Sequence, residues 1–519
     1  METDSDFDVI VIGGALTGAA TAFLLKRRDP SLRVLVVEKT PSFKRRVGEA
    51  TTEVSGWFLT RMLGLGGFLA RTQIPKNGLR FWFSGKTEDT LADCSELGGS
   101  YLSSVPAFLL DRSVLDTEIL SRAESLGVEV MRPARVLEST LQSGGLQALR
   151  ISYQDHEKTI RARWIVDASG VKAELSRSNG WLEPNTDHPT LAAWSRWRTV
   201  KEWDSLENSE ASADWNCGFQ GARGTATNHF TGEGWWAWWI QLRTGEVSIG
   251  AVIDQRATDW PKDGGTVGEK IRAFLSQHPA ARQMLDGAEF LDGDVHFRRN
   301  LPYSSRRYAG DGFILAGDAS AFLDPLYSPG MDWIAYTVAA AVHLVLEWRS
   351  GKEITPLVES INTHFNTSYK RQFETLYRDK YDYIGDYDLM RAAFRLDIST
   401  YYLFVVLPIF RKGECKLRTP PFATWHAIPF FHLMRLYNAR LAAIGRDRRR
   451  RGVFGRANAG RRDLVPGFNF RLPQLFKTFS HGLAIWVGLE IREGWRTWMR
   501  VETATSHVPA ETIPAGSAG

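Results

Sequence analysis

An α/β fold is predicted by three features close to the N-terminus. Residues 7–12 (FDVIVI) are a short apolar run rich in β-branched residues, which is typical of a buried parallel strand. A glycine-rich turn follows at 13–18, and residues 19–28 then have the spacing of a helix. Residues 32–37 (LRVLVV) predict a second buried strand, so the whole segment is predicted to be a βαβ unit.

The turn is close to the GxGxxG pattern of dinucleotide-binding proteins, with alanine in place of the middle glycine. Such a turn presents backbone N–H groups to a pyrophosphate, and the following helix adds a favourable dipole. Glu38 ends the second strand, where its carboxylate can accept hydrogen bonds from a ribose diol. The turn residues predicted to contact the dinucleotide are Gly13, Gly14, Ala15, Thr17 and Gly18. We therefore expect a Rossmann-like core.

The rest of the chain is predicted from its periodicity. Residues 113–125 favour an amphipathic helix, 146–153 and 159–166 favour paired strands, 191–254 favour an antiparallel sheet, and 312–316 favour a buried strand. Beyond about residue 386 the sequence is helical, aromatic and basic.

These segments predict three regions. Residues 1–385 form the nucleotide-binding core, with a substrate-covering antiparallel sheet inserted at about 190–300. Residues 386–502 form a helical, basic C-terminal region, and residues 503–519 form a disordered tail.

Composition limits the classes of function. The 519 residues are 43% hydrophobic, which is enough for a large core, and a net charge of +5 does not by itself indicate nucleic-acid binding. The three cysteines contain no CxxC pair, so neither a zinc site nor a disulfide framework is expected, and a cytoplasmic setting fits best. Charged residues interrupt the apolar stretch 331–348, which favours a buried core helix over a transmembrane segment.

Three further motifs, taken together with the glycine-rich turn, resemble those of flavoproteins that bind FAD. Residues 165–170 (IVDASG) resemble the short DATG turn, through Asp167. Residues 312–319 (GFILAGDA) resemble the GD motif, in which Gly317 is followed by Asp318 and the aspartate reaches the ribitol chain. Arg112, in LDRSVLD, matches an arginine at the start of a helix that borders the flavin.

Four segments resemble the flavin-dependent halogenases, and with the nucleotide motifs the resemblance covers residues 7 to about 350. Residues 322–330 (FLDPLYSPG) are similar to the signature FxxPxxSxG, and residues 48–51 (GEAT) to a segment against the flavin. Lys76, in IPKNGLRF, resembles the family's catalytic lysine. Residues 236–241 (WAWWIQ) resemble WxWxIP, with glutamine in place of the final proline.

This resemblance implies an enzyme that uses reduced FAD, O2 and chloride or bromide. Hypohalous acid formed beside the flavin would pass through a tunnel to the lysine, which aims it at an electron-rich aromatic ring. A separate flavin reductase would supply FADH2, because no reductase module is visible in the sequence.

The resemblance also assigns residues. The catalytic residues it implies are Lys76, Tyr327 and Ser328, and no metal site is expected. The further flavin contacts are Gly48, Glu49, Ala50, Arg112, Asp167, Gly317, Asp318, Pro325, Gly330 and Met331. The halide would lie against Pro329 and Gly330, and Trp236 and Trp238 would separate the flavin from the substrate.

Two departures from the family pattern bear on substrate and halide. In tryptophan halogenases a glutamate lies close to the signature serine, whereas the residue before Ser328 here is Tyr327, so a phenolic or pyrrolic substrate is favoured. Pro329 has no N–H, which leaves the Gly330 amide to hold the halide. An FAD-dependent aromatic monooxygenase without halogenating activity is the alternative, and a degenerate flavoprotein acting as a scaffold is a third hypothesis.

The C-terminal region contains an arginine-rich segment. Residues 435–462 hold ten arginines and the single acid Asp447. The segment could dock an acyl carrier protein that delivers the aromatic substrate, or, with the apolar stretch 401–410, make peripheral contact with an anionic membrane. A solvated helix end is an equally good interpretation, and no feature indicates nucleic-acid binding.

Overall fold

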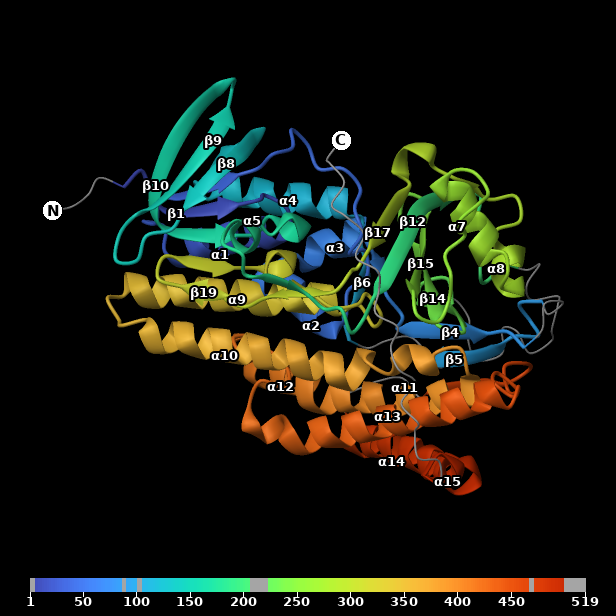
Figure 1. The fold of residues 1–519 in the computed structure, drawn as a ribbon. Coiled ribbons are helices and arrows are strands. Elements are labelled where there is room, and N and C mark those ends of the chain that lie inside the picture. The colour runs from blue at the N-terminus through green and yellow to red at the C-terminus, as the bar shows by residue number, and fades with distance from the viewer. Residues whose placement is uncertain (1–4, 86–89, 100–104, 206–222, 466–470, 499–519) are drawn as a thin grey trace, which may run out of the picture.

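The described part of the protein contains two large β-sheets, two small ones of three and two strands, and a layer of C-terminal helices (Figure 1). The computed structural model describes residues 5–85, 90–99, 105–205, 223–465 and 471–498. The expectation of a disordered tail at 503–519 falls outside these residues. The α/β class with a Rossmann-like core and a helical C-terminal region is confirmed.

The first sheet contains the predicted βαβ unit. Strand β1 (Phe7–Ile12) pairs in parallel with β2 (Val34–Val37) on one side and with β10 (His156–Asp167) on the other. Strand β20 (Phe313–Leu315) continues the sheet beyond β10, and β7 (Glu129–Met131) continues it beyond β2. Nearly every residue of β1 and β2 is buried, because helices cover one face of the sheet and further strands cover the other.

The parallel strands end in register at one edge. Ile12 is paired with Val37 and with Asp167, and Asp167 is paired with Leu315. The glycine-rich turn, Glu38 and the motif segments 165–170 and 312–319 therefore meet at the carboxyl edge of the sheet, which is where open α/β sheets bind their ligands.

The second sheet is the one predicted to cover the substrate side. Strands β12 (Thr190–Arg198), β15 (Val247–Asp254), β14 (Trp235–Gln241) and β13 (Thr227–Gly232) follow one another in antiparallel pairs. Strand β4 (Leu79–Phe83) then pairs in parallel with β13, so the segment that follows Lys76 is built into this sheet.

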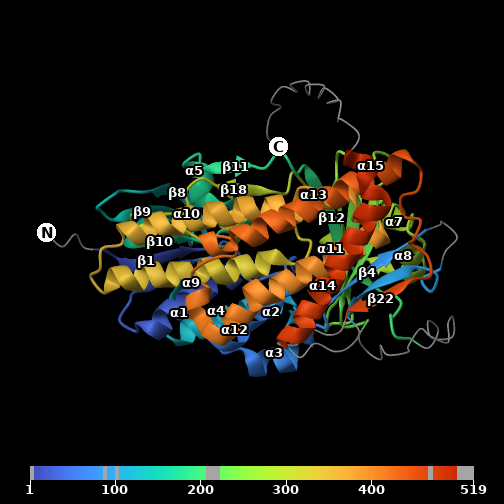
Figure 2. The same ribbon diagram turned by 90° about the horizontal axis from the view of Figure 1, so that it is seen from below.

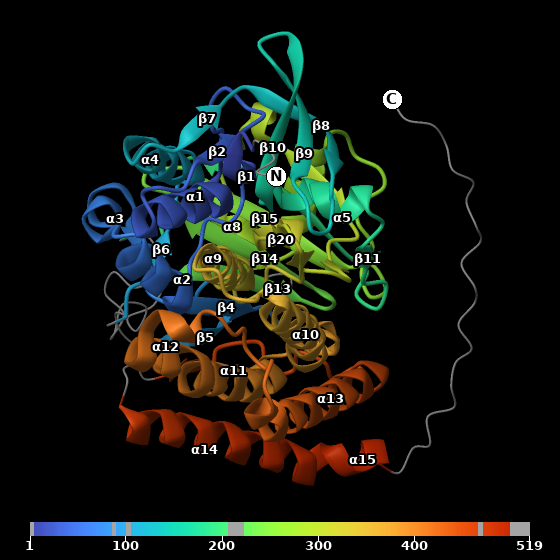
Figure 3. The ribbon, with the colours of Figure 1, turned by 90° about the vertical axis from the view of Figure 1, so that its left-hand side faces the viewer.

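Helices cover both sheets. Helices α1 (Leu16–Arg28) and α4 (Arg112–Ser125) pack together on the first sheet, and α9 (Pro329–Arg349) packs beside α1. The C-terminal helices are α10 (Thr355–Gln372), α11 (Tyr387–Tyr401), α12 (Leu407–Lys412), α13 (Ile428–Arg450), α14 (Leu472–Leu489) and α15 (Trp495–Trp498). Helices α9, α10 and α13 run roughly parallel (Figure 2), and α14 lies outermost, beneath α11 and α13 (Figure 3).

Shorter elements complete the fold. The remaining α-helices are α2 (Glu53–Trp57), α3 (Gly66–Thr72), α5 (Glu174–Ser178), α7 (Val267–Leu275) and α8 (Pro279–Met284). The remaining strands are β3 (Ile74–Pro75), β5 (Ser95–Gly99), β6 (Phe108–Leu109), β8 (Ala134–Thr140), β9 (Gln147–Tyr153), β11 (Leu182–Pro184), β16 (Glu289–Phe290), β17 (His296–Arg299), β18 (Tyr303–Ser305), β19 (Ala309–Gly310), β21 (Ala321–Phe322) and β22 (Arg462–Val465).

Strand β22 is an exception to the helical character predicted for residues 386–502. It pairs in parallel with β5 and extends the second sheet. The C-terminal region is thus joined to the substrate-side sheet by backbone hydrogen bonds as well as by helix packing.

Two helical stretches are long and apolar enough to span a membrane by composition alone. One is α9, whose apolar window is 78% buried inside the fold, and the other is Tyr387–Lys416, whose window is 61% buried. Core helices of soluble proteins have the same composition, so neither stretch is a clear transmembrane segment.

The arginines of the segment 435–462 are largely paired with acids of the same chain. They do not form the free basic surface on which the expected docking of a carrier protein depended. Arg448 is fully buried and donates hydrogen bonds to Asp386 (2.6 Å) and Glu493. Arg446 pairs with Asp382 at 2.6 Å. Arg451 bonds to Asp447 and Glu493. Except for Asp447, which lies in the segment itself, these acids come from other elements, so the local sequence does not reveal most of the pairing.

Candidate active site

The glycine-rich turn has the close approaches that its sequence predicts. A Cβ on Gly18 would lie 1.8 Å from the Gly13 carbonyl oxygen, and one on Gly13, whose φ is +96°, would lie 2.5 Å from the Ala168 oxygen. Only glycine is therefore tolerated at either position. Ala15 stands at the N-cap of α1, and Gly14 N donates to Glu38 Oε2 at 2.7 Å. The carboxylate predicted to bind a ribose is thereby fixed against the turn.

Asp167 is fully buried at the end of β10 and is fixed in the same way. Its carboxylate accepts hydrogen bonds from the backbone N–H groups of Ser169 (3.0 Å) and Leu175 (2.8 Å). Burial raises the pKa of Asp167 to about 6, against these hydrogen bonds. Asp167 therefore shapes the turn after β10, and its carboxylate faces protein N–H groups.

A first cavity of about 210 Å³ opens beside this edge. Arg112, at the start of α4, lines it and also bonds to Asp116 (3.0 Å). Asp318 lines the cavity as well, and burial raises the pKa of its carboxyl while the Arg112 charge opposes that rise. The predicted residues that line this cavity are Gly48, Glu49, Ala50, Arg112, Trp236, Trp238, Asp318, Pro325, Ser328, Pro329, Gly330 and Met331.

Strand β14 carries indole side chains on both faces. Trp236 and Trp238 belong to the main core and line the first cavity, whereas Trp235 and Trp239 pack in a separate core on the opposite face. The ring of Trp236 is oriented by its Nε1–H, which donates to Tyr381 at 2.8 Å. Tyr381 in turn donates to Asp324 of the signature segment at 2.8 Å. Tyr381 therefore connects β14 to the loop that precedes α9.

Tyr327 and Ser328 form a strained turn at the start of α9. Their φ angles are +68° and +59°, a left-handed conformation that costs about 1 kcal/mol or more for each residue. The Tyr327 hydroxyl donates to Asp397 of α11 at 3.1 Å, and Asp397 also accepts from Lys380 at 2.7 Å. The turn thus aims Pro329 and Gly330 between the cavities, and the C-terminal helices hold it there.

A second cavity of about 450 Å³ lies on the other side of this turn. Lys76, between β3 and β4, lines it with only 4% of its surface exposed. Its Nζ donates to the Thr51 carbonyl oxygen at 2.7 Å. Burial lowers the pKa of Lys76 to about 8, although the nearby Glu53 and Asp332 charges oppose that fall.

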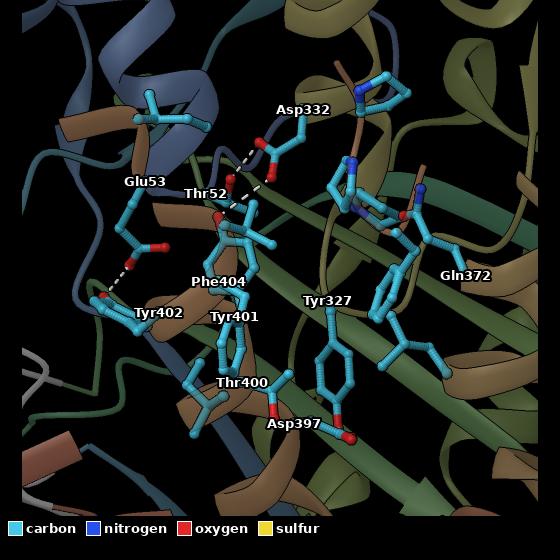
Figure 4. A pocket seen from close by; sticks show the side chains of 18 of the residues that line it. Thr52, Glu53, Tyr327, Asp332, Gln372, Asp397, Thr400, Tyr401, Tyr402 and Phe404 are labelled. Atoms are coloured by element: carbon cyan, nitrogen blue, oxygen red, sulfur yellow. Dashed lines mark hydrogen bonds between the residues drawn. The ribbon is translucent and has the colours of Figure 1, made fainter. Parts of the chain in front are cut away.

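Two carboxylates of the second cavity, Asp332 and Glu53 (Figure 4), were not predicted from the sequence, and their charges act on Lys76. Asp332, in the first turn of α9, accepts from Ser55 N (3.0 Å), Thr52 Oγ1 and Tyr401 OH (3.2 Å). Burial raises the pKa of Asp332 to about 6. Glu53 begins α2 and accepts from Tyr402 OH at 2.6 Å. In the sequence, Glu53 closely follows the GEAT segment and Asp332 closely follows the signature segment, and this proximity was the only indication that they belong to the site.

The partition between the two cavities differs from the one expected. Trp236 and Trp238 line only the first cavity. Pro329, Trp333 and Gln372 line both cavities and therefore form the partition. Trp333 is anchored by its Nε1–H, which donates to Ser320 at 2.9 Å. No group of three or more potential metal ligands occurs within the described ranges.

Comparisons with known proteins agree with this geometry. A profile of the FAD binding domain family matches residues 6–203. The flavin-dependent halogenase chlA of Dictyostelium discoideum is 26% identical over 467 residues, which cover 81% of this chain and 74% of the relative. The sulochrin halogenase gedL of Aspergillus terreus is 26% identical over 358 residues, which cover 64% of this chain and 61% of that relative. Together with the geometry, these comparisons support a flavin-dependent halogenase.

Solved structures of halogenases share the fold across most of their length. The crystal structure of halogenase PltM superposes with a TM-score of 0.73 at 18% identity, covering 93% of this chain and 97% of PltM. The flavin-dependent brominase Bmp2 gives 0.62 at 20% identity, covering 84% and 99%. The helical C-terminal region, for which the sequence offered no motif, is thus within the part of the fold shared with PltM.

FAD is the cofactor of this halogenase, and the residues around the first cavity fit it. The closely packed glycine turn precedes the N-terminus of α1, the position at which this kind of turn binds a pyrophosphate. Arg112 and Asp318 line the cavity with the indole rings of β14, and a Cβ on Gly330 would meet only open space. Gly13, Gly14 and Gly18 would hold the pyrophosphate, and Arg112 and Asp318 the flavin end.

Proposed function

We propose that this halogenase acts on a free, electron-rich phenol held in the second cavity, with Lys76 directing the oxidant. The single observation that carries the proposal is the position of Lys76. Its buried ammonium group lies in a cavity that only a thin partition separates from the cavity that fits FAD. When bound and reduced, FAD supplies the chemistry that converts halide and O2 into hypohalous acid.

Lys76 is suited to hold a small oxidant. One of its N–H bonds is used by the Thr51 carbonyl oxygen, which leaves further donors directed at the cavity. Because burial lowers its pKa to about 8, both the ammonium and the amine are accessible near neutral pH. The ammonium can donate a hydrogen bond to hypohalous acid, and the amine can form a haloamine.

The halide would lie at the start of α9. Pro329 occupies the first helical position, where it offers no N–H, so the Gly330 amide is the donor next to the cavity. Ser328 lines the same cavity, and Tyr327 lines the second cavity on the other side of the turn. The strained turn fixes the distance between the halide position and the substrate.

The chemistry of the second cavity favours a neutral phenol. Its lining is largely apolar and aromatic, with the carboxylates of Glu53 and Asp332 near the lysine. A phenolic O–H can donate to Glu53, which becomes the proton acceptor when the ring attacks the halogen. A free carboxylate on the substrate would be repelled by the same two acids.

Related halogenases support a phenolic substrate, and the arginine pairing supports a free one. PltM has been crystallised with phloroglucinol and FAD, and Bmp2 is a brominase. The arginines expected to dock a carrier protein are engaged by internal acids. We place the reaction in the cytoplasm, with a separate flavin reductase as the source of FADH2.

Mass spectrometry of a turnover mixture tests the proposal. The mixture contains the protein, FAD, a flavin reductase, NADH, O2, bromide and a panel of neutral polyhydroxylated phenols. We expect a product with a bromine isotope pair that is absent with Lys76→Met, although that variant still binds FAD. A product that gains one oxygen regardless of halide would instead establish an aromatic monooxygenase.

A further inference from the structure

We propose that the mouth of the second cavity docks on an anionic membrane surface and takes its aromatic substrate from the lipid. The docking surface is the segment 404–430, which we call the rim. The inference rests on the proposed function in one respect only, that the second cavity holds the substrate. Membrane binding itself can be measured without any turnover.

The rim exposes large apolar side chains around the cavity. Trp425 is 72% exposed and Phe404 is 44% exposed, and the Phe404 ring lies 3.6 Å from the ring of Phe430. Phe404 and Phe430 line the cavity, as do both chain neighbours of Trp425, Thr424 and His426. The exposed rings are thus continuous with the cavity lining.

The same rim is basic. Arg411, Lys412 and Lys416 are exposed, and Lys416 lines the cavity mouth. The acid of the rim, Glu414, is paired with Arg28 and with Arg418. Within the described ranges no ion pair joins Arg411, Lys412 or Lys416 to an acid from any element, so the charge of the rim complements an anionic surface.

A lipid surface fits this combination better than a protein partner. An exposed indole among lysines and arginines is the pattern of segments that lie in the membrane interface, because the ring and the aliphatic stems enter the headgroup layer while the charges meet phosphates. The cavity behind the rim is lined mainly by apolar side chains, so its substrate is of the kind that partitions into a bilayer.

The arginine-rich segment does not compete with the rim for this role. Arg446, Arg448 and Arg451 pair with acids of the same chain, as described above, whereas the rim contains a single acid among its cations. The apolar stretch 401–410, which the sequence suggested as a membrane contact, forms part of the cavity and its mouth through Tyr401, Tyr402 and Phe404.

Vesicle flotation of the full-length protein with FAD tests the proposal. We expect binding to vesicles of equal parts phosphatidylcholine and phosphatidylglycerol, and at least about tenfold weaker binding to phosphatidylcholine alone. Trp425→Ser should weaken binding by about tenfold or more. Arg411→Glu with Lys412→Glu should also weaken it by about tenfold, and raised salt should do the same to the wild-type protein.

Trp498→Ser is the matched control. Trp498, in α15, is 70% exposed, close to the value for Trp425, but it packs on Arg440, and α15 lies at the opposite end of the helical layer from α12 of the rim (Figures 1 and 3). We expect this variant to bind vesicles like the wild type. Absence of binding to anionic vesicles, or equal loss with Trp425→Ser and Trp498→Ser, would overturn the proposal.

A second measurement separates this inference from the proposed function. Halogenation of a water-soluble phenol by Trp425→Ser should match the wild type, because Trp425 itself does not line the cavity. Rim-dependent capture of an acidic carrier protein without vesicle binding would overturn the membrane as partner. Vesicle binding that survives in a protein unable to halogenate would leave the rim established and the proposed function wrong.

Discussion

The two cavities are built from different parts of the chain, although they meet at one turn. The first is lined by segments between residues 47 and 334, with only Tyr369 and Gln372 from beyond α9. The second has Thr52, Glu53, 76–79, Gly99 and Ala107 from the N-terminal part of the chain, but most of its lining lies between residues 327 and 434. Cofactor binding and substrate binding are thus assigned to different regions, and variants should separate them.

Lys76→Met is expected to have the largest effect, because it should nearly abolish halogenation without affecting FAD binding. Methionine preserves the volume of the stem but removes the donor, so halogenated product should fall by roughly a thousandfold while FAD binding is unchanged. Product is measured by mass spectrometry and FAD binding by fluorescence quenching, with reduced flavin and O2 consumed as in the wild type.

Lys270→Met is the control for this substitution. Lys270 Nζ also donates to a backbone carbonyl oxygen, that of Lys262 at 2.7 Å, but at the surface of α7. We expect wild-type halogenation from this variant. Equal loss of halogenation and of FAD binding with Lys76→Met would show that the two cavities are not functionally separate.

The reverse separation is expected from Gly18→Ala. Because its Cβ would lie 1.8 Å from the Gly13 carbonyl oxygen, the turn must open, and FAD affinity should fall by about a hundredfold. Equilibrium dialysis measures the affinity. Gly66→Ala, in α3, is the control, since its Cβ meets nothing within 4 Å. Unchanged FAD affinity with Gly18→Ala would contradict the assigned pyrophosphate site.

The difference between the cavities also explains what the sequence could predict. Gly13, Glu38 and Asp167 belong to short motifs whose spacing is set by one strand and one turn, and in the structure all three lie at one sheet edge. Lys76 was predicted through a motif as well. These elements are local, so a pattern in the sequence is sufficient to find them.

The second cavity depends on contacts between distant segments, which no local pattern reveals. Asp332 meets Thr52 and Tyr401 across long stretches of chain, and Glu53 meets Tyr402. The arginine-rich segment misled for the same reason, because Asp386 and Glu493 are far from Arg448 in the sequence. Side-chain pairs between different helices depend on the tertiary structure, so the sequence pattern alone does not predict them.

A smaller effect, on stability, should again distinguish the two cavities. Burial lowers the pKa of Lys76 from 10.5 to about 8. Below pH 8 the lysine is therefore charged in both states, but the charged form is less favourable in the folded protein than in the unfolded chain. Lys76→Met removes this cost of about 3 kcal/mol but leaves the Thr51 carbonyl oxygen unpaired, at about 1 kcal/mol. We expect a net gain of about 2 kcal/mol at pH 7, measured by urea denaturation.

The sign of the pH dependence tests the cause. Between pH 8 and 10.5 the unfolded chain binds more protons at Lys76 than the folded protein does, so this lysine makes wild-type stability rise with pH in that window. The rise should be missing in Lys76→Met and retained in Lys270→Met. A less stable Lys76→Met, or an unchanged pH dependence, would show that Lys76 is not strained by burial.

The smallest effect is expected at the turn that the cavities share. Pro329→Ala restores an N–H beside that of Gly330, and one added donor to an anion should lower the halide KM by about three- to tenfold. Halide dependence of product formation measures it. Pro279→Ala, at the first position of α8, makes the same substitution in a remote helix and should change nothing. Because Pro329 lines both cavities, an unchanged halide KM would place the halide elsewhere in the first cavity, and the turn would then act only as the partition that the oxidant must cross.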